Sequence, residues 1–260
     1  MLTRYDHSRD VIRKALRGRD LAPATAAVRA GMDPAALVAW LAEKAPEPPL
    51  EVLAGVLGLG AEALAALDSG VVAPPLPEGI RQLVLPFDDE TVNAWWIESA
   101  VETLLIDGGP DPGALISALG GRRPDRILLT HPHGDHLGGL RAFAGSGPEI
   151  LRGADLPTGG LALGGGRIHA QPLPGHHPEA WGFIFRDLEG AAHWAAVGDA
   201  LFMGSMGGCA DARAFQEACA SLAGLLRTLD PGTLLLTGHG PPSTVAAEWT
   251  GNAFAPCWPA

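Results

Sequence analysis

Four potential metal ligands within six residues constrain this chain more than any other feature. Residues 130–139 read Thr-His-Pro-His-Gly-Asp-His-Leu-Gly-Gly, an H-x-H-x-D-H pattern whose candidate ligands are His131, His133, Asp135 and His136. The apolar run directly before them predicts a strand, which delivers imidazole and carboxylate groups to one point at the edge of a sheet. This mixture of donors suits zinc or non-haem iron. Isolated histidines are more often ordinary surface or core residues, and we interpret four of them in this way: His7, His169, His177 and His193.

The length, charge and cysteine content of the chain narrow its class. A chain of 260 residues holds one large domain, or one domain of about 180 residues with a small companion. The net charge of −11 argues against nucleic acid or an anionic membrane as a partner, and no stretch approaches the ~18 apolar residues of a membrane span. The N-terminal residues lack the apolar core of a secretory signal, and three scattered cysteines imply no disulfide framework. We therefore expect a cytoplasmic protein that acts on a small molecule, with a composition typical of a high-GC bacterial genome.

A proline-rich segment over residues 73–79 divides the chain. Because proline cannot continue a helix or a central strand, we expect this segment to be an extended linker. It would join a helical domain over residues 1–72 to a catalytic domain over residues 80–260. The first part is expected to form five helices separated by glycine or proline, over 9–17, 23–30, 34–44, 50–57 and 61–67.

This succession of helices resembles the small helical domain of the lambda-repressor-like helix-turn-helix class. Residues 26–32 lie where that class places its first helix and turn, and residues 52–59 match its fourth helix. The expected recognition helix, residues 35–42, carries none of the Arg, Lys, Asn or Gln side chains that read base edges. Residues 1–70 hold eight basic and nine acidic side chains. We therefore favour packing, or dimerisation into a homodimer, over DNA binding as the role of this domain.

Beyond the linker, strand-like runs alternate with helical ones. The sequence predicts three antiparallel strands over 82–87, 92–98 and 101–107. A helix over 112–119 and a strand over 126–130 follow. Later elements are expected as strands near 149–152, 167–172, 181–187 and 192–197, a helix over 212–229 and a strand over 233–236. Mixed strands with helices before and after them predict an α+β fold, in which two sheets pack together under outer helices as an αββα sandwich.

Three further ligand-type residues follow apolar strands. His176 comes after Pro174-Gly175, Asp199 comes after Gly198, and His239 lies between two glycines. Glycine lets the backbone turn sharply at the end of a strand, so that a following side chain can face the sheet edge. Each signal is weak alone, but the order His, Asp, His after the H-x-H-x-D-H pattern makes the three support one another.

Together these motifs resemble the metallo-β-lactamase superfamily, and in detail its glyoxalase II (hydroxyacylglutathione hydrolase) branch, over residues 80–250. The resemblance rests on residues 107–109, 130–136, 174–176, 198–202, 238–241 and 242–248. It implies the metallo-β-lactamase fold and two divalent metal ions, with zinc favoured and iron or a zinc–iron mixture as alternatives. The implied ligands of the first ion are His131, His133 and His176, and those of the second are Asp135, His136 and His239. Asp199 would bridge the two ions, and Asp107 would orient the ligands.

The chemistry implied by this resemblance is hydrolysis. Two cations that share Asp199 and a water would lower the pKa of that water, so that a metal-bridged hydroxide attacks a carbonyl. We therefore predict a zinc-type metallohydrolase that cleaves a thioester or related activated ester, with Asp135 and Asp199 as catalytic residues. One alternative is a persulfide dioxygenase-like oxygenase with a single iron. Another is a regulatory or interaction protein that contains a metal centre. The complete second ligand set favours the hydrolase.

The substrate is less constrained than the reaction. The glyoxalase II and persulfide dioxygenase branches carry Cys-Gly-Arg after the Gly-Asp motif, whereas residues 206–211 here read Met-Gly-Gly-Cys-Ala-Asp. From residue 71 onward there are no lysines and only ten arginines against twenty acids. The carboxylates of glutathione are usually met by cationic side chains, and this part of the chain shows no such set. Cys209 is interpreted as a bystander thiol.

Overall fold

Five short helices form the N-terminal part of the chain, as the sequence predicts. The computed structural model describes residues 1–145 and 147–259. Its first helices are α1 (Ser8–Gly18), α2 (Pro23–Arg29), α3 (Pro34–Leu41), α4 (Leu50–Leu57) and α5 (Ala61–Ala66). Helix α3 shows why they begin where they do. Pro34 occupies its first turn, and the Asp33 carboxylate accepts a hydrogen bond from the Ala35 amide at 3.0 Å.

The first sheet has the strand order β1-β2-β3-β4-β5. Its strands are β1 (Ile80–Phe87), β2 (Glu90–Glu98), β3 (Thr103–Ile106), β4 (Arg126–Leu129) and β5 (Glu149–Arg152). The first three are antiparallel, as predicted, whereas β3, β4 and β5 are parallel. β3 begins two residues later than predicted, because the Ser99 hydroxyl accepts hydrogen bonds from the Val101 and Glu102 amides and closes a turn.

The second sheet has the order β11-β10-β9-β8-β7-β6. Its strands are β6 (Leu161–Leu163), β7 (Gly166–Pro172), β8 (Trp181–Asp187), β9 (Ala192–Gly198), β10 (Leu234–Thr237) and β11 (Ser243–Thr244). Among the described residues of this sheet, β9 and β10 pair in parallel, and the other neighbouring strands pair antiparallel. The carboxyl ends of β9 and β10 therefore lie at the same edge of the sheet. The sequence did not predict β6 and β11, since three and two residues are too few to show a period.

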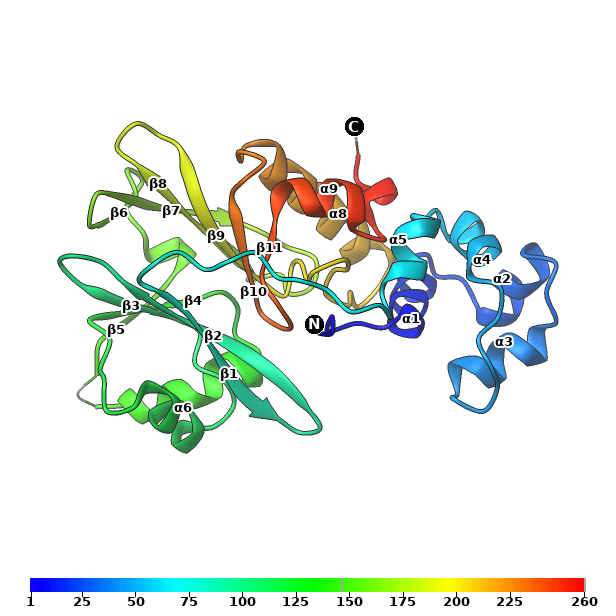
Figure 1. Ribbon diagram of the computed structural model, residues 1–260, viewed down its shortest axis with the longest axis horizontal. Helices are drawn as coiled ribbons and strands as arrows, with labels where there is room; N and C mark the ends of the chain where they lie inside the picture. Colours follow the sequence, from blue (N-terminus) through cyan, green and yellow to red (C-terminus); the bar gives the residue numbers. More distant parts are fainter. Residues whose placement is uncertain (146, 260) are drawn as a thin grey trace.

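Helices cover the outer face of each sheet (Figure 1). Buried side chains of α6 (Pro112–Leu119) pack on the first sheet, and those of α8 (Ala212–Arg227) and α9 (Val245–Gly251) pack on the second. A separate apolar cluster that includes Trp95, Phe183 and Trp194 fills the space between the sheets. The remaining short elements are α7 (Gly134–Leu137), η1 (Gly138–Phe143), η2 (Gly153–Asp155) and η3 (Ala255–Cys257). The predicted αββα sandwich is confirmed. No helix among the described residues is long and apolar enough to cross a membrane.

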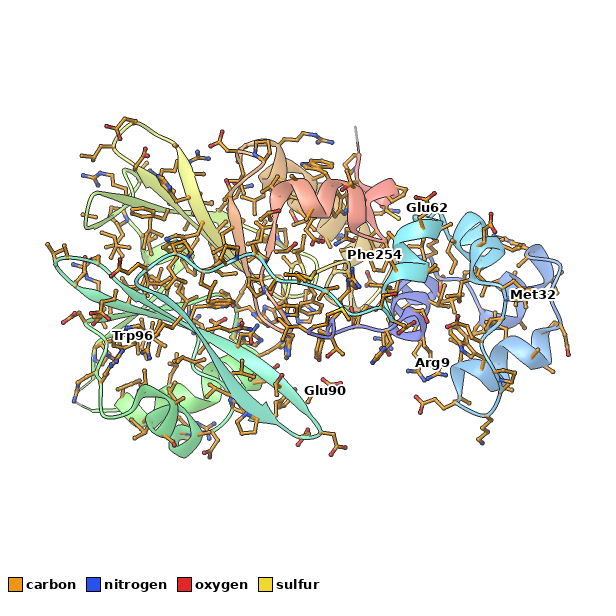
Figure 2. All side chains as sticks on the ribbon, in the orientation of Figure 1. Arg9, Met32, Glu62, Glu90, Trp96 and Phe254 are labelled. Carbon is orange, nitrogen blue, oxygen red and sulfur yellow. The ribbon has the colours of Figure 1, made fainter. Side chains whose placement is uncertain are left out.

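The N-terminal helices share a core with the layer formed by α8 and α9. One cluster of buried side chains joins Ile12 of α1 and Leu64 of α5 to this layer. Figure 2 labels Phe254 at this junction, where it packs on Phe215 of α8 at 5.8 Å between ring centroids. A Cβ on Gly18 would come within 2.4 Å of the Phe215 ring, so α1 and α8 approach closely. Residues 72–77 form neither helix nor strand, but the division into two domains stays a prediction.

Candidate metal centre

The seven predicted ligands come from four chain segments that meet at one edge of the sandwich. The segment 131–136 follows β4, and single residues follow β7, β9 and β10. Their donor atoms form two groups, each within 4.8 Å: His131, His133 and His176 in one, and Asp135, His136, Asp199 and His239 in the other. The structure therefore brings together every residue that the sequence proposed as a ligand. Their binding of metal stays a prediction.

The first group consists of three imidazoles that point at one another. His133 Nδ1 lies 3.1 Å from His131 Nε2 and 2.9 Å from His176 Nε2. The other ring nitrogens of the last two are held from outside: His176 Nδ1 donates to the Gly208 carbonyl at 2.8 Å, and His131 Nδ1 lies 3.0 Å from the Thr130 hydroxyl. Burial, with the neighbouring imidazoles, lowers the pKa of His131 to about 2, and burial also lowers the pKa of His176. Three imidazoles that converge in this way can offer ring-nitrogen lone pairs to a cation.

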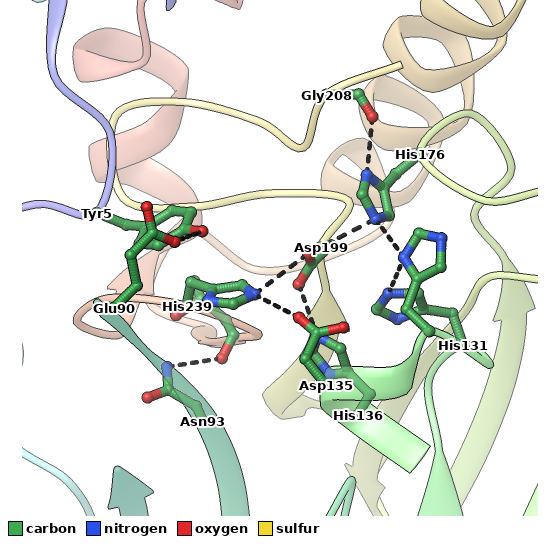
Figure 3. Close-up of polar contacts among 12 residues, drawn as sticks. Tyr5, Glu90, Asn93, His131, Asp135, His136, His176, Asp199, Gly208 and His239 are labelled. Carbon is green, nitrogen blue, oxygen red and sulfur yellow. Dashed lines mark hydrogen bonds and ion pairs between the residues drawn. The ribbon is translucent and has the colours of Figure 1, made fainter. Parts of the chain in front are cut away.

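The second group adds carboxylates to two imidazoles and is more deeply buried. His136 Nε2 lies 3.2 Å from Asp199 Oδ1, and His239 Nε2 lies 3.3 Å from Asp135 Oδ2 (Figure 3). Asp199 also faces the first group, since its Oδ2 atom is 3.6 Å from His176 Nε2. This carboxylate thus stands between the two groups, which is the position that a bridging ligand requires.

Asp107 fixes the orientation of the second group. Its Oδ2 atom accepts hydrogen bonds from His136 Nδ1 at 2.8 Å and from the Thr130 hydroxyl at 2.7 Å, while its Oδ1 atom accepts from the Thr130 amide. Asp107 sits at the end of β3 with a φ of 60°, a left-handed conformation that is uncommon for a residue other than glycine. The orienting role that the resemblance implied for Asp107 agrees with these contacts.

Two buried atoms of the second group have no hydrogen-bond partner among the described residues: His136 Nε2 and Asp199 Oδ1. With the Nδ1 proton of His136 bonded to Asp107, a neutral imidazole would present the lone pair of Nε2 to the oxygen of Asp199, and two lone pairs would face each other. Burial works to lower the pKa of His136, yet the carboxylates of Asp199 and Asp107 raise it well above its usual range. The geometry therefore favours a positive charge between these atoms, and the residues fit a metal ion.

Glycines allow the close approach of the segments that carry these ligands. A Cβ on Gly238, next to His239, would lie 2.0 Å from Asp199 Oδ1. Gly198 has a φ of 49°, and a Cβ there would lie 2.6 Å from the Thr130 hydroxyl. The glycines beside Asp199 and His239 in the sequence are thus required by the packing of the site as well as by the turn.

Sequence reasoning missed the residues that cover the centre from the N-terminus. The ring of Tyr5 stacks on His239 at 4.3 Å between centroids, and its hydroxyl donates to Glu90 of β2 at 2.5 Å (Figure 3). Lys14 of α1 donates to the Met206 carbonyl at 3.0 Å. No local pattern marks these residues, since each lies far along the chain from the side chain or loop that it contacts. Only the tertiary packing of α1 reveals them.

Two residues that the sequence set aside lie near the centre. The ring centroid of His177 is 4.9 Å from that of His133, although its Nδ1 atom accepts a hydrogen bond from the Glu179 amide. Cys209 lines the cleft above the ligands, and burial raises the pKa of its thiol to about 11. A thiol with such a pKa stays protonated at neutral pH, which agrees with its interpretation as a bystander.

Comparison with known proteins supports this reading of the fold and the centre. Residues 87–154 match the model of the metallo-beta-lactamase superfamily. A hydroxyacylglutathione hydrolase of Anaeromyxobacter dehalogenans is 32% identical over 53% of this chain and 57% of its own length. The chain thus spans little more than half of that relative. A probable metallo-hydrolase of Bacillus subtilis, YqgX, is 29% identical over 65% of this chain and 95% of its own length.

The solved structures extend the likeness to the whole sandwich. The crystal structure of BLEG-1, a B3 metallo-beta-lactamase, superposes with a TM-score of 0.53 and 23% identity, over 68% of this chain and 99% of that one. At this identity the likeness shows the fold alone. The chain therefore has the metallo-beta-lactamase fold, its residues 87–154 resemble that superfamily in sequence, and its two His/Asp groups lie at the edge of the sandwich. The helical region that precedes this fold is present, but its relation to the lambda-repressor-like class stays a prediction.

Proposed function

We propose that this protein is a metal-dependent hydrolase that cleaves a thioester or related activated ester at a dinuclear centre. The observation that carries the proposal is the complete second ligand group beside the first, with Asp199 facing both. In this proposal His131, His133 and His176 hold one ion, and the second ion is held by Asp135, His136 and His239. Two bound cations would supply the charge that activates a water and polarises the carbonyl of the substrate.

The chain's own residues prepare the centre for this reaction. Asp107 holds the proton of His136 on Nδ1, so that Nε2 remains free to bind a cation. Burial works to raise the pKa of Asp199, but the imidazoles of His136 and His239 lower it far below its usual range. Burial works to raise the pKa of Asp135, but the bond from His239 and the charge of His136 together lower it. Both acids therefore stay ionised at neutral pH, and can bind cations and accept a hydrogen bond from the attacking water.

The names of the relatives support hydrolysis more strongly than a particular substrate. Curated relatives carry the names hydroxyacylglutathione hydrolase and probable metallo-hydrolase. The chain covers only 57% and 63% of the two hydroxyacylglutathione hydrolases. A glyoxalase II-like thioesterase activity is therefore our proposal, with zinc as the favoured metal and iron or a zinc–iron mixture as alternatives.

The second candidate is an oxygenase of the persulfide dioxygenase type with a single iron. Such an enzyme would need His131, His133 and His176 with Asp199, which the structure also brings together. It would leave His136 Nε2, a buried atom without a hydrogen-bond partner in the described chain, with no role. This atom favours the dinuclear hydrolase.

Metal analysis combined with an activity panel separates the two candidates. Purified protein should contain about two metal ions per chain and hydrolyse members of a panel of thioesters and lactones. Consumption of oxygen with a persulfide substrate and one iron per chain would instead support the oxygenase. A protein that binds two metals but turns over no member of the panel would contradict the proposed thioester chemistry, and would favour a regulatory role for the centre.

A further inference from the structure

The cleft above the metal centre is built partly by the N-terminal helices. It has a volume of about 330 Å³, and His176 and Asp199 form part of its lining. Helix α1 contributes Arg13, Lys14 and Arg17 to the same lining. A cleft of this size suits a small molecule. A substrate bound in this cleft would therefore lie beside three cationic side chains from one helix.

These cations stand out against the charge of the whole chain. The first twenty residues hold six of the eighteen basic side chains but only three of the twenty-nine acids. Arg13 and Arg17 are four residues apart and thus lie one turn apart on the same face of α1. A basic face inside an otherwise acidic protein concentrates attraction for anions at this cleft.

Two of the three cations are already engaged. Lys14 Nζ donates to the Asp6 carboxylate at 2.5 Å and to the Met206 carbonyl at 3.0 Å. Arg13 donates to Asp10 at 3.3 Å and also to the Leu41 carbonyl. These contacts fix α1 against the rest of the cleft and leave little capacity for a ligand.

Arg17 is different, because its exposed guanidinium has no hydrogen bond or ion pair within residues 1–145 and 147–259. The acids of the lining that lie outside the metal centre each have a hydrogen-bond partner: Asp6 bonds to Lys14, Asp10 to Arg13 and Glu90 to the Tyr5 hydroxyl. None of these acids forms an ion pair with Arg17. A guanidinium offers paired N–H donors that match a carboxylate or a phosphate.

We propose that Arg17 binds an anionic group of the substrate, a carboxylate or a phosphate, while the scissile carbonyl lies at the metal centre. This inference rests on the proposed function and names the chemical class of its substrate. The loop at Met206–Gly208 links the two sites, since Lys14 of α1 bonds to its first residue and His176 bonds to its last. In this proposal the helical region recognises the substrate. The chain from residue 71 onward then need not supply the cationic side chains that bind the anionic group.

The last turn of a second helix provides a matched control. Arg29 occupies the last turn of α2, as Arg17 does in α1, and is likewise exposed. Both arginines lie near the negative end of a helix dipole, but Arg29 does not line the cleft. Arg17→Gln and Arg29→Gln therefore remove the same charge from equivalent helix positions, and only the first should affect binding.

Binding of stable thioethers to the zinc-loaded full chain tests the proposal without requiring turnover. Calorimetry would compare S-methyl-N-acetylcysteine with its neutral carboxamide, and S-methyl-4′-phosphopantetheine with S-methylpantetheine. The wild-type protein should bind the anionic member of at least one pair about tenfold more tightly, and the preferred pair tells carboxylate from phosphate. Arg17→Gln should abolish this preference without changing the Kd of the neutral member or the zinc content. Arg29→Gln should keep the preference of the wild type.

The outcomes separate this inference from the proposed function. Equal binding of both members by the wild type, or a preference that survives Arg17→Gln, would overturn the inference even if thioesters are hydrolysed. A preference that depends on Arg17 in a protein that hydrolyses no thioester would leave the anion site standing and refute the hydrolase. An effect of Arg29→Gln as large as that of Arg17→Gln would show only general electrostatic attraction, and would also overturn the inference.

Discussion

Two buried carboxylates, Asp199 and Glu248, show that this protein holds interior charge in two different ways. Glu248 on α9 is 1% exposed and accepts hydrogen bonds from the Gly204 amide at 3.0 Å, from Asn252 Nδ2 at 2.7 Å and from the Ser243 hydroxyl. Asp199 is 7% exposed, and its Oδ1 atom lies 3.2 Å from His136 Nε2 without a hydrogen-bond partner among the described residues. Both carboxylates contribute to the same region, since Gly204 follows Asp199 by only five residues.

The difference lies in what balances the charge. Three neutral donors bond to Glu248 and the Arg4 guanidinium lies near it, so its carboxylate joins β11, α9 and the loop at Gly204 through the chain's own groups. Imidazole nitrogens and the Asp135 carboxylate surround Asp199. Only bound protons or metal ions can balance the negative charge that collects there. We therefore infer that Glu248 serves the fold and Asp199 serves the metal. Substitutions at the two positions should separate stability from activity.

Replacing the metal-facing carboxylate should have the largest effect. Asp199→Ala removes the group that stands between the two ligand sets. We expect the catalytic rate to fall on the order of 10³-fold, which corresponds to a loss of about 4 kcal/mol of transition-state stabilisation. The fold should persist, because no structural donor depends on this side chain. Metal content and turnover should be measured beside a circular dichroism spectrum and a thermal melt of the same sample. Normal turnover in Asp199→Ala would refute the assignment of the centre.

The opposite result is expected at the structural carboxylate. Glu248→Ala leaves the Gly204 amide and the Asn252 side chain without their acceptor in a buried place, at a cost of about 3 kcal/mol in the free energy of unfolding. Chemical denaturation would measure this loss. Metal content and activity at 25 °C should remain those of the wild type. Loss of metal with unchanged stability would show that the two carboxylates do not differ as the structure indicates.

A substitution at Asp107, beside the centre, should distinguish the two ligand groups of the metal site from each other. Asp107→Asn can still accept from Thr130, but its amide would face the Nδ1 proton of His136 with a second donor. The imidazole would then favour its other tautomer, with the proton on the atom that should bind metal. We expect the affinity for one of two ions to fall by about 10–100-fold, as measured by chelator competition. Equal weakening of both ions would contradict the division into two groups.

The sequence predicted the residues that form the two His/Asp groups but not the residues above them, and the reason is physical. Each ligand lies directly after an apolar strand, so its position follows from local structure: His131 after β4, Asp199 after β9 and His239 after β10. Tyr5 and Arg17 reach the cleft only because α1 packs on α8, and no short-range pattern encodes that contact. Helix α9 and its Glu248 were also missed as an element, since a seven-residue helix shows little periodicity.

The smallest expected effect is the pH dependence of stability at Glu248. Burial raises the pKa of this acid, and the bonds from Ser243, Asn252 and Gly204 only partly oppose the rise. The native state therefore binds this proton more tightly than the unfolded state. The stability that it contributes is complete below the unfolded pKa of 4.5 and is lost as pH rises through the native value. Glu248→Gln does not titrate, so its melting temperature relative to the wild type should increase from pH 4.5 toward neutrality, by a few degrees at most.

Asp68 provides a control of opposite sign for this measurement. Burial would raise the pKa of Asp68, but its bonds with His7 and Ser8 lower it below 3.8, so that its contribution to stability is present above that pH and is lost in acid. Asp68→Asn should therefore lose melting temperature relative to the wild type as pH rises above 3.8. Both sets of melting temperatures should be measured in the presence of a chelator. The titration of the metal-centre residues is then the same in every variant and cancels when a variant is compared with the wild type. If the melting temperatures of both variants shift in the same direction, the pH dependence comes from the changed net charge. Glu248 would then not be the buried carboxylate with a raised pKa that its contrast with Asp199 requires.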